Sequence, residues 1–120
     1  MSKKNLKDKQ ASCAVDYGFQ RIGGKYKCRL IWYIHERKVV RYGELKRMVK
    51  GITPKMLTQT LRELEEDELV IRKAYHEVPP KVEYTLTPIA EELIPFINHV
   101  KQWAERRMEE LPGPIEPIAC

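Results

Sequence analysis

Four polar side chains between residues 53 and 68 have the types and spacing needed for contacts with nucleic acid. They lie on one side of a predicted helix, and the other side carries Leu57, Leu61 and Leu64 at i, i+4 and i+7. The polar set, whose members can reach phosphate oxygens and base edges, is Lys55, Thr58, Gln59 and Arg62. The carboxylates are confined to the far end of this segment, so its N-terminal half is predicted to contact the nucleic acid. The plain alternative is a solvated amphipathic helix.

A basic hairpin is predicted directly after this helix. Residues 70–75 and 82–86 alternate in the manner of short strands, and Pro79 and Pro80 lie in the turn between them. The two prolines remove backbone donors from the tip, which suits an exposed loop. The candidate DNA contacts of the hairpin are Arg72, Lys73, His76 and Lys81. A polar-faced helix followed by a basic hairpin is more specific for a winged helix than either feature alone.

The segment before this helix completes a helix-turn-helix pattern. A short helix is predicted over residues 42–49, and Lys50 and Gly51 form the turn that follows it. Thr53 is a good N-cap, and Pro54 suits the first helical position. Residues 39–41 are a candidate first strand. We therefore predict an α+β fold, mostly α: a winged helix-turn-helix with a two- or three-stranded wing sheet and a C-terminal dimerisation helix.

Charge is distributed unevenly along the 120 residues. Residues 1–87 contain 19 Lys and Arg against 11 Asp and Glu, whereas residues 88–120 contain 3 against 6. This asymmetry indicates a polyanionic partner for the front part only. No apolar run approaches the ~20 residues of a membrane span, so a cytoplasmic protein is expected. The predicted segments are a basic arm (1–12), a winged-helix domain (13–87), a dimerisation helix (88–111) and an irregular tail (112–120).

The dimerisation helix is expected to be one long helix with a kink near residues 91–94, because Pro95 removes a backbone hydrogen bond. Its apolar stripe is wider than one small domain can cover, although part of it could belong to the core of a single chain. The residues predicted to bury against a second copy are Phe96, Ile97, Val100, Trp103 and Ala104. A two-fold dimer would place two reading helices about 34–36 Å apart and require a near-palindromic operator.

Three cysteines without a CxxC motif or a ligand-like histidine spacing argue against a metal site. Cys28 lies beside the apolar stripe of a helix predicted over residues 25–37, which favours a packing role. Ser12 could cap a following helix and so place Cys13 in its first turn, where the helix dipole favours a thiolate. An incidental thiol is the alternative for Cys13, and Cys120 has no assigned role. No nucleophile–base pair and no phosphate loop are apparent, so neither an enzyme nor a cofactor is expected.

Several motifs occur in register along the chain. They are Cys13, Gly23-Gly24-Lys25, Tyr42-Gly43-Glu44-Leu45, Gly51-Ile52-Thr53, Leu57-Thr58, Leu61, Leu64-Glu65, Pro79-Pro80, Val82-Glu83-Tyr84, Leu86-Thr87 and Trp103. Together they resemble the HxlR family of bacterial winged-helix regulators across about residues 13–108. The chain departs from the family pattern at Ala14, Tyr26, Glu68 and Ala90. Glu68 replaces a glycine that usually ends the recognition helix, which predicts a less favourable left-handed helix end.

The resemblance implies dimeric binding to double-stranded DNA and control of transcription, often of genes that respond to reactive small molecules. It also implies that Cys13 senses electrophiles or oxidants. Two alternatives remain open at this stage. One is a winged-helix module that contacts protein or RNA without binding a specific duplex, and the other is a regulator switched by a bound small ligand.

Overall fold

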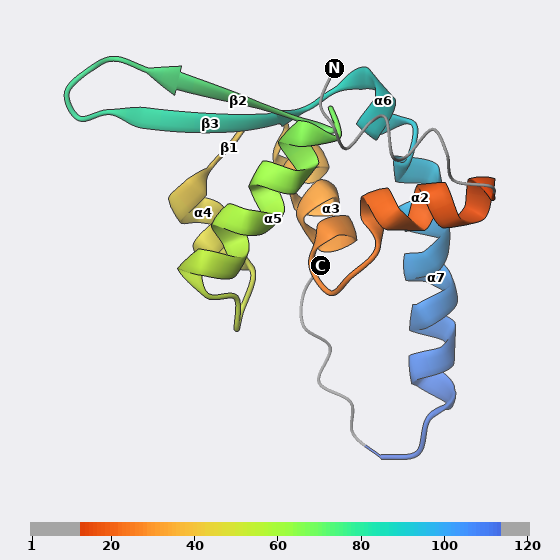
Figure 1. Cartoon of the computed structure of the whole chain (residues 1–120). Coiled ribbons are helices and arrows are strands. Elements are labelled where there is room, and N and C mark those ends of the chain that lie inside the picture. Colours follow the sequence, from red (N-terminus) through yellow and green to blue (C-terminus); the bar gives the residue numbers. More distant parts are fainter. Residues whose placement is uncertain (1–12, 114–120) are drawn as a thin grey trace.

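The computed structural model describes residues 13–113, and it shows a helical body from which a long hairpin projects (Figure 1). Residues 1–12 and 114–120, including the predicted arm, most of the predicted tail and Cys120, lie outside the described residues. The elements are α2 (Ala14–Ile22), α3 (Lys27–Arg37), β1 (Val40–Arg41), α4 (Tyr42–Met48), α5 (Pro54–Glu66), β2 (Val70–Tyr75), β3 (Lys81–Leu86), α6 (Pro88–Glu91) and α7 (Ile94–Glu110). The predicted winged helix-turn-helix is confirmed.

The sheet is three-stranded and antiparallel, with the strand order β1-β3-β2. Strands β2 and β3 pair from Val70 opposite Leu86 to Tyr75 opposite Lys81, and β1 adds the pair of Val40 and Tyr84. The candidate first strand is therefore present. In β2 only Val70 is buried and residues 71–74 are exposed, whereas Tyr84 of β3 is buried and the rest of β3 is half-buried. The hairpin extends beyond the helices (Figure 1).

The core lies where side chains of α3, α4 and α5 meet. Leu57, Leu61 and Leu64 are 0–2% exposed, as the i, i+4, i+7 spacing predicted. They belong to one cluster with Leu30, Ile31 and Ile34 of α3 and with Leu45 and Val49 at α4. Burial of each leucine contributes about 1.5–3 kcal/mol, so this apolar stripe fixes which side of α5 turns outward.

Two residues with positive φ shape the ends of the helix-turn-helix. Gly51 has φ 87°, which a residue without Cβ adopts readily, and it reverses the chain between α4 and α5. Glu68 has φ 60° just after α5. This is the left-handed conformation predicted for the helix end, where Glu68 stands in place of the usual glycine. The carbonyl of Glu68 accepts a hydrogen bond from the Thr87 hydroxyl at 2.7 Å, which ties this helix end to the start of α6.

The expected single C-terminal helix is wrong in one respect: the chain is broken into α6 and α7 rather than kinked. Glu92 and Leu93 form a turn between the two helices, and the Leu93 amide donates to the Ala90 carbonyl at 3.0 Å. Pro95 then sits in the first turn of α7, where no backbone N–H is required. A proline that begins a new helix explains the break better than one within a continuous helix.

Candidate nucleic-acid interface

Helix α5 begins as its sequence predicts. The Thr53 hydroxyl accepts a hydrogen bond from the Met56 amide at 3.1 Å, and Pro54 occupies the first turn. Capping by a threonine contributes about 1 kcal/mol and fixes where the helix starts. The buried leucine stripe then determines which side chains of α5 point away from the body.

The four predicted reading residues, Lys55, Thr58, Gln59 and Arg62, are all exposed on the outer face of α5. The Gln59 amide donates to the Glu63 carboxylate at 3.0 Å, so its side chain lies along the helix in the free protein. Lys55 forms no ion pair within residues 13–113 and stands alone near the helix start. The outer face thus presents polar side chains and two cations, Lys55 and Arg62, that form no ion pair within residues 13–113. Such groups contact phosphates and base edges.

A groove of about 470 Å³ separates α5 from the wing, and we refer to it as the helix–wing groove. Its lining residues are Tyr42, Thr58, Leu61, Arg62, Glu65, Arg72, Val82 and Tyr84. Burial raises the pKa of Tyr84, although a hydrogen bond from Arg72 acts in the opposite direction. Tyr84 therefore stays a neutral phenol at physiological pH, and Arg72 is held against the base of the wing beside Arg62.

The cations of the wing are partly neutralised by their neighbours. Lys81 lies 3.9 Å from a carboxylate oxygen of Glu77 and 3.9 Å from one of Glu83. The ammonium groups of Lys73 and Lys81 lie 4.9 and 4.5 Å from the ring centroid of Tyr75. His76 is exposed near the tip. The predicted wing residues are thus brought together, but their net positive charge is smaller than a count of lysines and arginines suggests.

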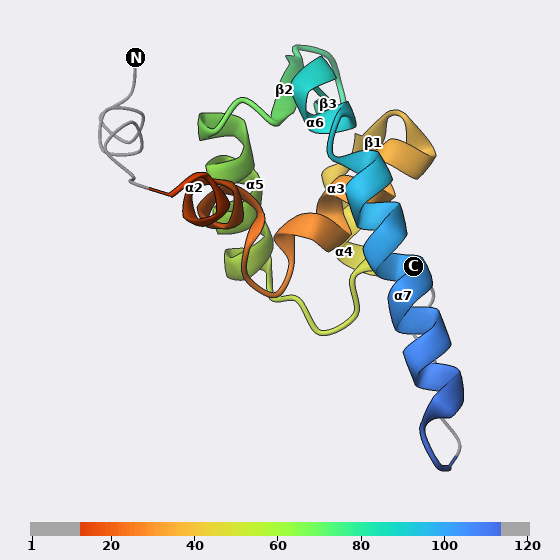
Figure 2. The same ribbon diagram turned by 90° about the vertical axis from the view of Figure 1, so that its right-hand side faces the viewer.

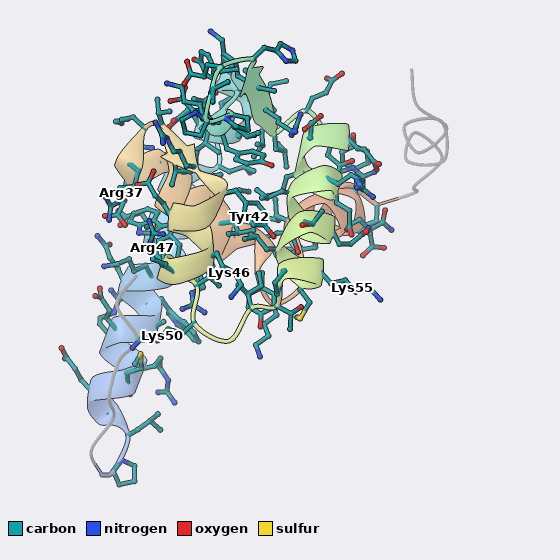
Figure 3. All side chains as sticks on the ribbon, turned by 90° about the vertical axis from the view of Figure 1, so that its left-hand side faces the viewer. Arg37, Tyr42, Lys46, Arg47, Lys50 and Lys55 are labelled. Carbon is teal, nitrogen blue, oxygen red and sulfur yellow. The ribbon has the colours of Figure 1, made fainter. Side chains whose placement is uncertain are left out.

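A basic patch on and around α4 was missed by the sequence analysis (Figure 3). It consists of Arg37, Lys46, Arg47 and Lys50, and Figure 3 shows these residues on the same face of the molecule as Lys55. Within residues 13–113 none of the four forms an ion pair with a carboxylate. Residues 37–50 contain six Lys and Arg against one Glu, so a local charge count would have revealed the patch.

Cys13 is the N-cap residue of α2 and is exposed. Its predicted position in the first turn is therefore wrong by one residue, and Ser12 lies outside the described residues. Cys28 is half-buried in α3, where its thiol donates weakly to the Ile22 carbonyl at 3.4 Å. Burial raises the pKa of Cys28, so it stays protonated at neutral pH and reacts slowly.

The predicted dimerisation residues divide into two groups. Phe96, Val100 and Trp103 are 40%, 43% and 54% exposed, and Ala104 is partly exposed. Ile97 is only 8% exposed and belongs to the core of the chain, so its predicted place on an outer surface is wrong. The reason is that α7 packs against α3 along the side that carries Ile97.

Helix α2 extends the same exposed surface, which the sequence analysis did not predict. Phe19 meets Phe96 edge-on, with ring centroids 6.2 Å apart, and Val15 is 64% exposed one turn away. We call the set Val15, Phe19, Phe96, Val100 and Trp103 the α2–α7 apolar face. In Figure 2 both helices lie at the front of the molecule, on the side away from the wing tip. An exposed surface of this composition is a candidate interaction site.

Comparison with known proteins assigns the family. The sequence profile described as HxlR-like helix-turn-helix matches residues 21–112. The chain belongs to the HxlR family. An HTH-type transcriptional regulator, YybR of Bacillus subtilis, is 41% identical over 109 residues, which cover 91% of this chain and 86% of YybR. As an HxlR-family member the chain is a transcriptional regulator of the helix-turn-helix type and not an enzyme.

Solved structures of other regulators share the fold. The redox regulator HypR in its oxidised form is 42% identical with a TM-score of 0.74, covering 78% of this chain and 96% of HypR. The reduced form of the transcriptional regulator YodB from B. subtilis is 30% identical with a TM-score of 0.67, covering 87% of this chain and all of YodB. Within the described residues of this HxlR-family chain, no helix is long and apolar enough to cross a membrane.

Proposed function

We propose that this HxlR-family chain binds a near-palindromic operator as a homodimer and that thiol chemistry at Cys13 changes its affinity. The observation that carries the DNA-binding part is the exposed polar face of α5 beside the unpaired cations of the basic patch. Gln59 and Arg62 would read base edges in the major groove, while Lys55 and the basic patch would hold phosphates. Arg72, Lys73, His76 and Lys81 of the wing would add contacts beside the reading helix.

The α2–α7 apolar face supports the homodimer. It lies on the opposite side of the molecule from the wing tip, so a second copy seated there leaves both reading helices uncovered (Figures 1 and 2). Large aromatic residues dominate the binding energy of protein interfaces, and Phe19, Phe96 and Trp103 are of this kind. A two-fold axis through this face would present two copies of α5 to successive major grooves, about 34–36 Å apart.

The position of Cys13 suggests how a thiol signal would reach α5. Cys13 caps α2, and Arg21 in the last turn of α2 lies 3.7 Å from Asp67 at the end of α5. Lys27 at the start of α3 lies 3.1 Å from Glu63 of α5. A shift of α2 after modification of Cys13 would therefore act on the C-terminal end of the reading helix through these ion pairs.

The comparisons favour a thiol signal over a bound ligand. HypR is described as a redox regulator and is solved in oxidised and reduced forms, and YodB is solved after treatment with diamide. From the sequence, Tyr17, Phe19, Trp32 and Tyr33 could line a ligand pocket, and two of these four are used differently here. Tyr33 is 3% exposed in the core, and Phe19 belongs to the α2–α7 apolar face.

A gel-shift titration against the DNA upstream of the chain's own coding sequence tests the proposal, with excess unrelated competitor DNA. The reduced wild-type chain should bind selectively, and diamide should change its affinity. Cys13→Ser should bind like the reduced wild type and ignore diamide, whereas Cys28→Ser is the matched control and should still respond. If diamide changes the affinity of Cys13→Ser as much as that of the wild type, the thiol switch is refuted. If the wild type shows no selective binding, operator recognition is refuted.

Labelling with iodoacetamide at neutral pH provides a second, independent readout of the thiol. Mass spectrometry should find Cys13 modified well before Cys28, because Cys13 is exposed and burial raises the pKa of Cys28. Equal labelling rates for the two cysteines would contradict the assignment.

A further inference from the structure

Tyr42 links the two helices of the helix-turn-helix through its hydroxyl group. This hydroxyl lies 3.1 Å from the carbonyl oxygen of Pro54 and 3.1 Å from the hydroxyl oxygen of Thr58. Tyr42 belongs to α4, whereas both of its partners belong to the first turns of α5. Figure 3 shows Tyr42 between these two helices.

The number of hydrogens available determines the direction of these bonds. A carbonyl oxygen only accepts, so the single hydroxyl hydrogen of Tyr42 is given to Pro54. The contact between Tyr42 and Thr58 then needs a hydrogen from Thr58, which donates to the Tyr42 oxygen. The only hydrogen that Thr58 could offer to a ligand is therefore already used.

Within the described residues, the Thr58 hydroxyl forms no hydrogen bond to a carbonyl of its own helix. Two residues later, the Thr60 hydroxyl donates to the Met56 carbonyl at 2.7 Å, the usual bond from a helical threonine to residue i−4. The hydroxyl of Thr58 contacts Tyr42 instead. The exposed side of Thr58, which lines the helix–wing groove beside Arg62, thus offers lone pairs and a methyl group.

A threonine in the major groove ordinarily pairs with either donors or acceptors on the bases. We infer that Tyr42 removes this ambiguity and makes Thr58 an acceptor that selects a base presenting an amino group, adenine N6 or cytosine N4. Phosphate oxygens, guanine O6 and thymine O4 only accept, and they would face the lone pairs of Thr58. Tyr42 is thus a positioning residue for base specificity. This inference rests on the proposed operator binding. It adds that one base of the operator presents an amino group to Thr58.

The test uses a duplex that the reduced wild-type chain recovers from a randomised pool. At each position adenine is replaced by purine, or cytosine by pyrimidin-2-one, which removes only the amino group. In a second set A·T is exchanged for G·C, or C·G for T·A, which puts a carbonyl oxygen where the amino group was. Affinities are measured by competition for the wild type and for Tyr42→Phe, Thr58→Val and Thr58→Ser. Tyr84→Phe is the matched control, because it removes a tyrosine hydroxyl from the same groove, whereas the hydrogen-bond partner of Thr58 is Tyr42. Thermal melting checks that each variant is folded.

At one position the wild type should lose about fivefold in affinity when the amino group is removed, the value of one hydrogen bond. Thr58→Ser and Tyr84→Phe should lose as much, whereas Thr58→Val should lose nothing there. When a carbonyl oxygen takes the place of the amino group, Tyr42→Phe should lose at least about threefold less affinity than the wild type, because Thr58 can then turn its hydrogen toward that oxygen. The inference is overturned if Tyr42→Phe discriminates against the carbonyl oxygen as strongly as the wild type, or if Thr58→Val still loses affinity when the amino group is removed. Recovery of no selective duplex by the wild type would instead refute operator binding itself.

Discussion

Asp67→Asn removes one charge of the ion pair that joins α2 to the end of the reading helix. In the native chain Arg21 Nε lies 3.7 Å from Asp67 Oδ1, and the two side chains are 9% and 0% exposed. Asparagine keeps the size of the side chain but cancels its charge. The guanidinium of Arg21, which also stacks on the Tyr17 ring at 4.3 Å, would then remain buried without this counter-charge.

The expected cost follows from the distance and the burial. At an effective dielectric constant of about 20, two charges this far apart attract by about 4 kcal/mol. Removal of one partner of a buried pair typically costs about 3–5 kcal/mol, since the other charge is left buried. We expect a loss of about 3 kcal/mol in the free energy of unfolding, or a fall of about 2 M in the urea midpoint.

Urea unfolding followed by tryptophan fluorescence and circular dichroism measures this loss, at one fixed protomer concentration because a dimer unfolds in a concentration-dependent way. Glu105→Gln is the matched control. It breaks the 3.1 Å pair of Lys101 and Glu105 on α7, whose side chains are 34% and 57% exposed. A pair on the surface of one helix is worth about 0.5 kcal/mol or less.

The double variant Arg21→Met with Asp67→Asn separates the pair from its surroundings. Because it removes both charges, its cost should be about 1–3 kcal/mol smaller than the sum of the two single variants. A contribution of the ion pair is refuted if Asp67→Asn lowers the free energy of unfolding no more than Glu105→Gln does. It is also refuted if the losses of Arg21→Met and Asp67→Asn add up to the loss of the double variant. Either result would also remove the ion pair as a route from α2 to α5.

Three further predictions concern the reading face, the helix end and the apolar face. Arg62→Ala should relax base preference in competition assays, whereas Lys55→Ala should weaken all duplexes alike and reduce the salt slope by about one unit; equal behaviour would contradict their division of roles. Glu68→Gly should raise the free energy of unfolding in urea by about 1 kcal/mol, because φ is 60° there, and a destabilised variant would refute this. Trp103→Lys should weaken self-association at least about thirtyfold in light scattering, whereas Val39→Lys, 45% exposed outside the apolar face, should not.

The helix-turn-helix and the wing could be predicted from the sequence because their signals are local. The Thr53 cap, the leucine spacing and the alternation after residue 70 each act within a few residues. The positive φ of Glu68 was also predictable, since the departure from glycine occurs at a helix end.

The features that the sequence analysis missed depend on contacts between distant elements. The spacing of Ile97 and Val100 does not determine which of the two side chains contacts α3. Ile97 belongs to the core because α7 packs against α3 on the side that carries it. The contact of Phe19 with Phe96 likewise requires α2 and α7 to lie side by side. The break between α6 and α7, by contrast, lies at Glu92 and Leu93, within residues 91–94 where Pro95 predicted a kink; only its extent differed from the prediction.

Hydroxyl-radical footprinting shows whether two reading helices of a homodimer contact one operator together. The reduced wild-type chain would be bound to a duplex recovered from a randomised pool. We predict two protected regions related by a dyad, with centres about 10–10.5 base pairs apart, the spacing of two helices in successive major grooves. A single protected region, or two regions without dyad symmetry, would contradict the proposed arrangement.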